Sequence, residues 1–91
     1  MFNVTEAARA RLFELLADDP NDVAVRLVRR RGHSRLRRGN ARPGDTVFEF
    51  DGRTVLLLKE GFAEKLRNRT LSLQETEKGP RLRLRRTSRS R

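Results

Sequence analysis

The dipeptide Asp51-Gly52 lies between two apolar runs, residues 46–50 and 54–58, in a chain of 91 residues. Asp-Gly accepts the positive φ angles of a tight type I′ turn, which joins two antiparallel strands. The spacing therefore predicts a β-hairpin over residues 46–58. A chain of this length forms one domain around one core. The remaining elements must therefore pack against this hairpin.

Residues 5–17 are predicted to form an amphipathic helix. Thr5 can cap its first turn, because its hydroxyl can accept a hydrogen bond from a free backbone amide. Behind the cap, four apolar residues recur at helical spacing: Ala8, Leu12, Leu15 and Leu16. Residues 18–21 include Pro20 and end the helix. Apolar side chains then alternate over residues 23–29, which is typical of a strand.

Residues 31–44 show no apolar period and contain three glycines, an asparagine and a proline, so we expect a long loop rich in turns. A short helix is expected over residues 59–66. Leu71 and Leu73 mark a strand, and a polar turn over residues 76–80 leads to a last strand in which Leu82 and Leu84 alternate with arginines.

Together these elements predict an α+β fold with mixed β-sheets of about five strands, flanked by an N-terminal helix and a short second helix. We expect a single domain over residues 1–86 and a flexible basic tail over residues 87–91.

Positive charge is concentrated in two segments of this chain, whose net charge is +10. Residues 23–44 contain eight arginines and no acid, and residues 81–91 contain six arginines and no acid. The rest of the chain has eight basic and twelve acidic residues and is mildly acidic. This asymmetry predicts a localised electropositive surface.

Clustered guanidinium groups match phosphate and carboxylate oxygens, which they bind in bidentate fashion. The partner predicted from this charge is an acidic protein surface or the phosphate backbone of a nucleic acid. No aromatic residue lies inside either basic segment, so base stacking is not expected. The candidate anion- or partner-binding residues are Arg29, Arg30, Arg31, Arg35, Arg37, Arg38, Arg83, Arg85 and Arg86.

Two alternatives for these arginines stay open. The first is a solvated, arginine-biased surface without a specific partner. The second concerns the row Arg81, Arg83 and Arg85, whose charge can protect an edge strand from aggregation.

The chain contains no cysteine and a single histidine, His33. Disulfides, thiolate metal sites and cysteine nucleophiles are therefore excluded. We expect no catalytic residue, no metal and no cofactor, with one alternative, a metal shared by two copies of His33 across a homo-oligomer. No apolar stretch approaches the length of a membrane span, and we expect a cytoplasmic protein that does not bind membranes.

The order and spacing of the segments resemble the A-type iron–sulfur carriers, the HesB/IscA-like domains, over about residues 3–85. The resemblance lies in the Val4-Thr5-Glu6-Ala7-Ala8 helix start, the Val25-Arg26-Leu27 strand leading to Gly32-His33-Ser34, the hairpin from Asp45 to Val55, and the segment from Leu66 to Leu73. It implies a compact mixed β-structure flanked by two helices.

Family members bind iron or an iron–sulfur cluster through one cysteine in a Gly-Cys-Ser-Gly-like loop and a Cys-Gly-Cys near the C terminus. Here His33 takes the first position, and residues 85–91 lie where the second pair would be. Clusters are held by thiolates, and a guanidinium has no lone pair to offer iron. We therefore expect a non-enzymatic binding or scaffold domain with an arginine-rich face. The alternative is an accessory protein of iron–sulfur cluster assembly that docks other proteins without carrying a cluster.

Overall fold

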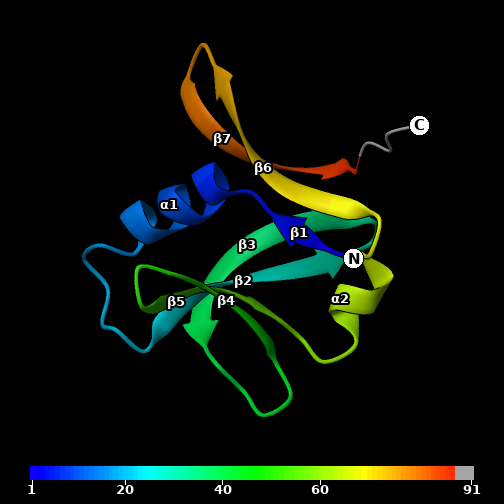
Figure 1. The fold of residues 1–91 in the computed structure, drawn as a ribbon, viewed down its shortest axis with the longest axis horizontal. Coiled ribbons are helices and arrows are strands. Elements are labelled where there is room, and N and C mark those ends of the chain that lie inside the picture. The colour runs from blue at the N-terminus through cyan, green and yellow to red at the C-terminus, as the bar shows by residue number, and fades with distance from the viewer. Residues whose placement is uncertain (88–91) are drawn as a thin grey trace.

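Residues 1–87, the part of the chain that the computed structural model describes, form two β-sheets and two helices (Figure 1). The smaller sheet has the strand order β1-β6-β7, and the larger sheet has the order β3-β2-β5-β4. This arrangement confirms the predicted α+β class. The elements are β1 (Asn3–Val4), α1 (Glu6–Leu15), β2 (Val23–Arg30), β3 (His33–Asn40), β4 (Thr46–Phe50), β5 (Arg53–Leu58), α2 (Phe62–Lys65), β6 (Arg69–Thr76) and β7 (Gly79–Arg86).

The β4–β5 hairpin forms as predicted and turns at Asp51 and Gly52, whose φ angles are 53° and 79°. On its other side β5 pairs in parallel with β2. Since β5 is thus an interior strand of the sheet, Val55 to Leu58 are all 0% exposed. The most apolar strand therefore forms the centre of the sheet.

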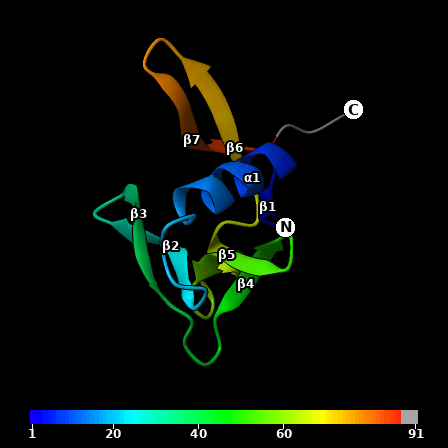
Figure 2. The same cartoon turned by 90° about the vertical axis from the view of Figure 1, so that its left-hand side faces the viewer.

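Helix α1 lies between the two sheets (Figure 2) and contacts both β5 and β6. The Thr5 hydroxyl accepts a hydrogen bond from the Ala8 amide at 3.1 Å, which confirms the predicted cap. Ala8, Leu12 and Leu16 are fully buried, but Leu15 remains 37% exposed at the edge of the apolar stripe. The helix thereby joins the two sheets through one apolar cluster.

The prediction of a long loop over residues 31–44 is wrong, because residues 33–40 form the strand β3. β2 and β3 pair antiparallel from Val23 with Asn40 to Arg30 with His33. β3 is a free edge strand whose residues are exposed except for the half-buried Gly39. A strand without a buried face needs no apolar alternation, so the periodicity gave no sign of it.

The β6–β7 hairpin is longer than expected, since the strands extend to Thr76 and from Gly79 and leave only a two-residue turn. Leu82 pairs with Leu73, and Leu84 pairs with Leu71. Together with β3, the two-residue strand β1 raises the described strands to seven, above the five expected. β1 is too short to show a period in the sequence.

Residues 88–91 of the expected basic tail lie outside the described residues. Thr87, the first residue assigned to that tail, donates its amide to the Asn68 carbonyl at 2.8 Å. Its hydroxyl lies 2.7 Å from that of Thr70. Within residues 1–87, no helix has the length and apolar character needed to cross a membrane.

Candidate functional site

The first basic segment forms the β2–β3 hairpin, which projects from the body of the molecule (Figure 2). Its turn consists of Arg31 and Gly32, whose φ angles are 50° and 81°. This is the same positive-φ pair as at Asp51-Gly52, here with an arginine in the first position. The turn therefore holds the Arg31 side chain at the tip of the hairpin.

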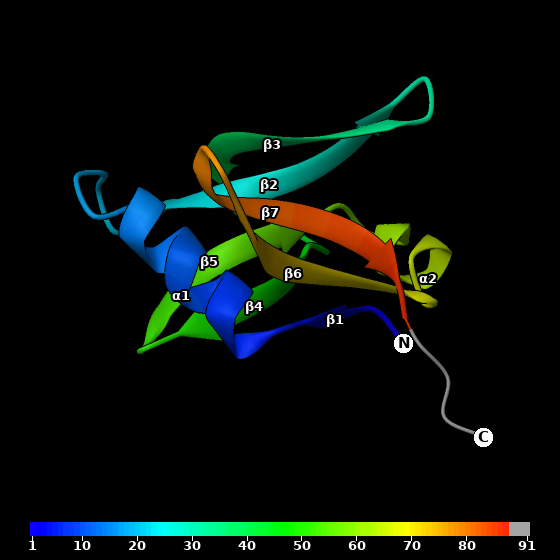
Figure 3. The ribbon, with the colours of Figure 1, turned by 90° about the horizontal axis from the view of Figure 1, so that it is seen from above.

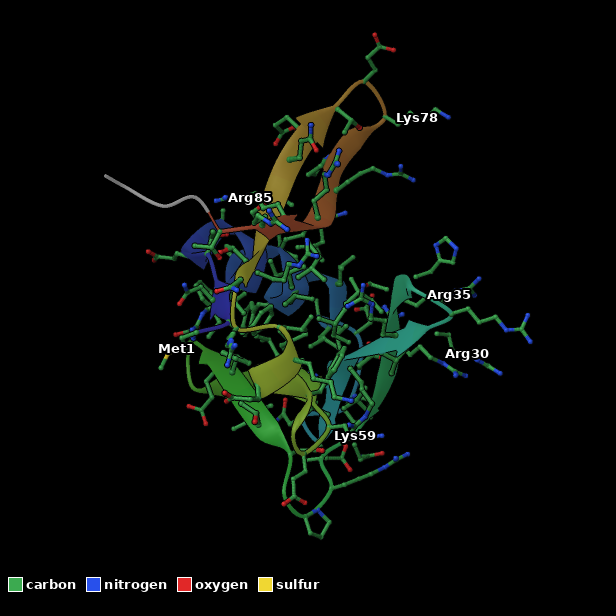
Figure 4. All side chains as sticks on the ribbon, turned by 90° about the vertical axis from the view of Figure 1, so that its right-hand side faces the viewer. Met1, Arg30, Arg35, Lys59, Lys78 and Arg85 are labelled. Carbon is green, nitrogen blue, oxygen red and sulfur yellow. The ribbon has the colours of Figure 1, made fainter. Side chains whose placement is uncertain are left out.

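One face of this hairpin carries Arg30, Arg35 and Arg37 beside His33. The strand register places Arg30 opposite His33 and Val28 opposite Arg35, and residues that pair across a ladder point to the same face. A shallow pocket of about 550 Å³ lies on the hairpin, and no acidic residue lines it. The lining residues are Val28, Arg30, Arg31, His33, Arg35, Leu36 and Arg37. Figure 4 shows Arg30 and Arg35 extending into solvent.

The other face carries Arg29 and Arg38, and these two arginines differ in their contacts. Arg38 donates to Asp19 Oδ2 at 2.8 Å and to the Leu15 carbonyl at 3.0 Å. Arg38 therefore connects the hairpin to the end of α1 and the loop after it, and its guanidinium is engaged in an internal contact. Arg29 makes no ion pair with any of residues 1–87 and faces a second pocket, formed with α2.

That second pocket contains residues that the sequence did not suggest. Its volume is about 520 Å³, and α2 and the residues preceding it contribute Lys59, Lys65 and Phe62. β2 and β5 pair in parallel through Val25 with Leu56 and Arg26 with Leu57, so both strands run toward the same end of the sheet. A prediction that β2 and β5 pair in parallel would have placed Lys59, which follows β5, beside the hairpin.

The base of the hairpin is held by an ion pair between Arg26 and Asp45. The Arg26 guanidinium donates to Asp45 Oδ2 at 2.6 Å and to Oδ1 at 3.2 Å, and the Arg42 amide donates to Oδ2 at 2.7 Å. These bonds, that from Arg26 foremost, lower the pKa of Asp45 below its ordinary value. The pair fixes the loop of residues 41–45 against β2 below the arginine-rich tip.

The described arginines of the second basic segment lie on the β6–β7 hairpin, where Arg83 lines a pocket together with Leu36 of β3. Arg83 donates to Gln74 at 2.9 Å and Arg85 donates to Ser72 at 3.3 Å, along the face of the β6–β7 hairpin. The turns of the two hairpins lie apart from each other (Figure 3). Arg86 lines a further pocket with Met1 and Arg69. The nine candidate arginines therefore form at least two surfaces, and Arg85 is well separated from Arg30 and Arg35 (Figure 4).

An iron–sulfur cluster does not fit the residues at the expected first ligand position. His33 shares its pocket with Arg30, Arg31 and Arg35, whose positive charges oppose a bound cation. The chain has no thiolate at all, and residues 1–87 contain no cluster of three or more metal-ligating side chains. The described surface presents donors for anions where a cluster would need sulfur ligands.

Comparison with known proteins finds similar folds but no match by sequence: no protein-family model and no curated protein matches the chain. The crystal structure of Escherichia coli SufA, which is involved in biosynthesis of iron–sulfur clusters, is 22% identical. The match covers 93% of this chain and 84% of that one, with a TM-score of 0.76. A crystal structure of IscA with the [2Fe-2S] cluster is 20% identical, covers 94% and 85%, and has a TM-score of 0.58. These likenesses confirm the expected HesB/IscA-like fold.

Proposed function

Starting from a HesB/IscA-like fold that has no cysteine, we propose that this protein is a non-enzymatic, cytoplasmic binding domain whose β2–β3 hairpin docks an anionic partner. The partner is an acidic protein surface or a nucleic-acid phosphate backbone. One observation carries the proposal: on the projecting hairpin, five arginines make no ion pair with any of residues 1–87. They are Arg29, Arg30, Arg31, Arg35 and Arg37.

The energetics of like charges support this assignment. Guanidinium groups on one short hairpin repel each other, and an anion relieves this repulsion. Each fork can hold two oxygens of a phosphate or a carboxylate. An anionic partner would therefore stabilise the hairpin, whose guanidinium groups repel one another in the free protein.

The test is a salt titration of binding to duplex DNA, structured RNA and polyglutamate, with a hairpin variant and a charge-matched control. The hairpin variant carries Arg30→Glu, Arg35→Glu and Arg37→Glu. The control carries Arg67→Glu, Lys78→Glu and Arg81→Glu, which change the net charge equally at exposed residues outside the β2–β3 hairpin.

For DNA, loss of three phosphate contacts should reduce the magnitude of the slope of log affinity against log salt concentration by about 2 to 3. The control should retain the wild-type slope. Equal losses in both variants would mean that total charge, not the hairpin, drives binding. Absence of binding to all three polyanions at low salt would remove the proposal.

A second function is favoured by the fold likeness to SufA, which is involved in biosynthesis of iron–sulfur clusters. In this alternative the protein docks a component of cluster assembly and carries no cluster itself. Pull-down from the source cells, with and without nuclease, separates the two. Nuclease-resistant recovery of an assembly protein by the wild type but not by the hairpin variant supports docking, whereas nuclease-sensitive recovery supports nucleic acid.

A further inference from the structure

The pocket between the β2–β3 hairpin and α2 combines a cationic rim with an apolar wall. Its rim carries four cations from three separate parts of the chain: Arg29 and Arg31 from the hairpin, Lys59 after β5, and Lys65 in α2. We propose that this pocket binds a nucleotide, with the phosphates on the rim and the base against Phe62. The inference deepens the proposed function, since Arg29 and Arg31 belong to both surfaces.

The rim has an uncompensated positive charge. Glu60 is the single acid in the lining, so four cations and one acid leave a net charge of +3. The Glu60 carboxylate lies close over Gly44, where an added Cβ would be 2.7 Å from its Oε1. None of the four cations forms an ion pair within residues 1–87. A polyphosphate supplies the negative charge that the rim lacks.

The wall distinguishes this pocket from a simple phosphate site. Phe62 is half-buried and packs against the apolar core, so its ring is held in place. Leu27, which is 2% exposed, and Val28 continue the apolar wall. The volume of about 520 Å³ lies within the range of roughly 300 to 1,000 Å³ that is usual for small-ligand sites. Any of the nucleic-acid bases can stack on such a ring, because each base presents a planar π-face.

Glycine backbone leaves the entrance to this pocket open. Gly32 and Gly61 both have positive φ angles, 81° and 84°, and no atom lies within 4 Å of a Cβ added at either. The chain therefore approaches the pocket from both sides without side chains that would fill it. This arrangement brings the Phe62 ring beside the basic segment, which itself contains no aromatic residue.

Calorimetric titration with ATP and with inorganic tripolyphosphate tests the proposal. ATP should bind more tightly than tripolyphosphate, because only ATP has a base for Phe62. Phe62→Leu keeps an apolar side chain but removes the ring, and it should weaken ATP about tenfold while leaving tripolyphosphate unchanged. A thermal melt verifies that this variant is folded.

Charge variants provide the second arm. Lys59→Gln with Lys65→Gln should weaken both ligands, whereas Arg67→Gln with Lys78→Gln, the matched control, should weaken neither. Equal affinity for ATP and tripolyphosphate, or an unchanged ATP affinity in Phe62→Leu, overturns the nucleotide site, as does an absence of ATP binding at low salt. Because Lys59 and Lys65 lie outside the hairpin, this outcome is independent of whether the hairpin variant loses polyanion binding.

Discussion

Arginine side chains in this protein have two different roles. Arg53 donates to the carbonyls of Leu16, Pro20 and Val23 and so secures the end of α1. Arg26, in the middle of β2, is 8% exposed and pairs with Asp45. Among the exposed arginines of the β2–β3 hairpin, Arg38 shares this internal role. The other five form no ion pair with any of residues 1–87: Arg29, Arg30, Arg31, Arg35 and Arg37. A count of charge along the sequence cannot separate these two groups, because each role depends on which acceptors the fold brings near.

The Arg26–Asp45 pair predicts a specific pH dependence of stability. The pKa of Asp45 is lowered from its ordinary value of 3.8, so its contribution is complete above that value and is lost as the pH falls through the lower, folded-state pKa. Asp45→Asn should lower Tm at pH 7, and the difference from the wild type should shrink below about pH 4. Thermal melts from pH 7 to pH 2 measure this.

The matched control for that experiment is Glu64→Gln, because Glu64 pairs with Arg67 in a highly exposed contact of 3.6 Å. Exposed pairs contribute little to stability. A constant Tm difference between wild type and Asp45→Asn across the whole pH range would contradict the role of the Asp45 charge.

At the level of elements, two hairpins use the same turn but only one was predictable. Asp51-Gly52 is flanked by apolar alternation on both sides, whereas Arg31-Gly32 is followed by the exposed strand β3. Pairing with β2 decided the conformation of β3, since its own side chains bury no face. The missed strand is also the one that carries Arg35 and Arg37.

Two glycine substitutions separate turn geometry from strand propensity. Gly52→Ala should destabilise the protein by about 1 to 2 kcal/mol, because a Cβ is strained at positive φ, and Gly52 has a φ of 79°. Gly39, within β3, has no positive φ and no atom near an added Cβ. Gly39→Ala should therefore raise stability by about 0.5 to 1 kcal/mol. Urea unfolding of both variants checks the opposite signs, and a loss in both would refute the distinction.

At the scale of the whole molecule, the SufA- and IscA-like fold is present without a cluster-ligand set. Anaerobic reconstitution with iron and sulfide should leave the protein colourless, because clusters require thiolate ligands and the chain contains no cysteine. His33→Ala serves as the matched variant and should behave identically. A persistent visible absorption band that is lost in His33→Ala would show ligation by His33 and contradict this expectation.

Residue types and local periodicity were sufficient to predict α1, the β4–β5 hairpin and the fold resemblance, and the composition excludes thiolate ligands. These features depend on residue type and local period, which the chain displays directly. Only the three-dimensional fold shows how the candidate arginines divide between separate surfaces and that Arg38 makes an internal contact. It also placed Phe62, Lys59 and Lys65 beside Arg29. The parallel pairing of β2 with β5 brings those residues together, and a contact between strands so far apart in the chain has no local signature.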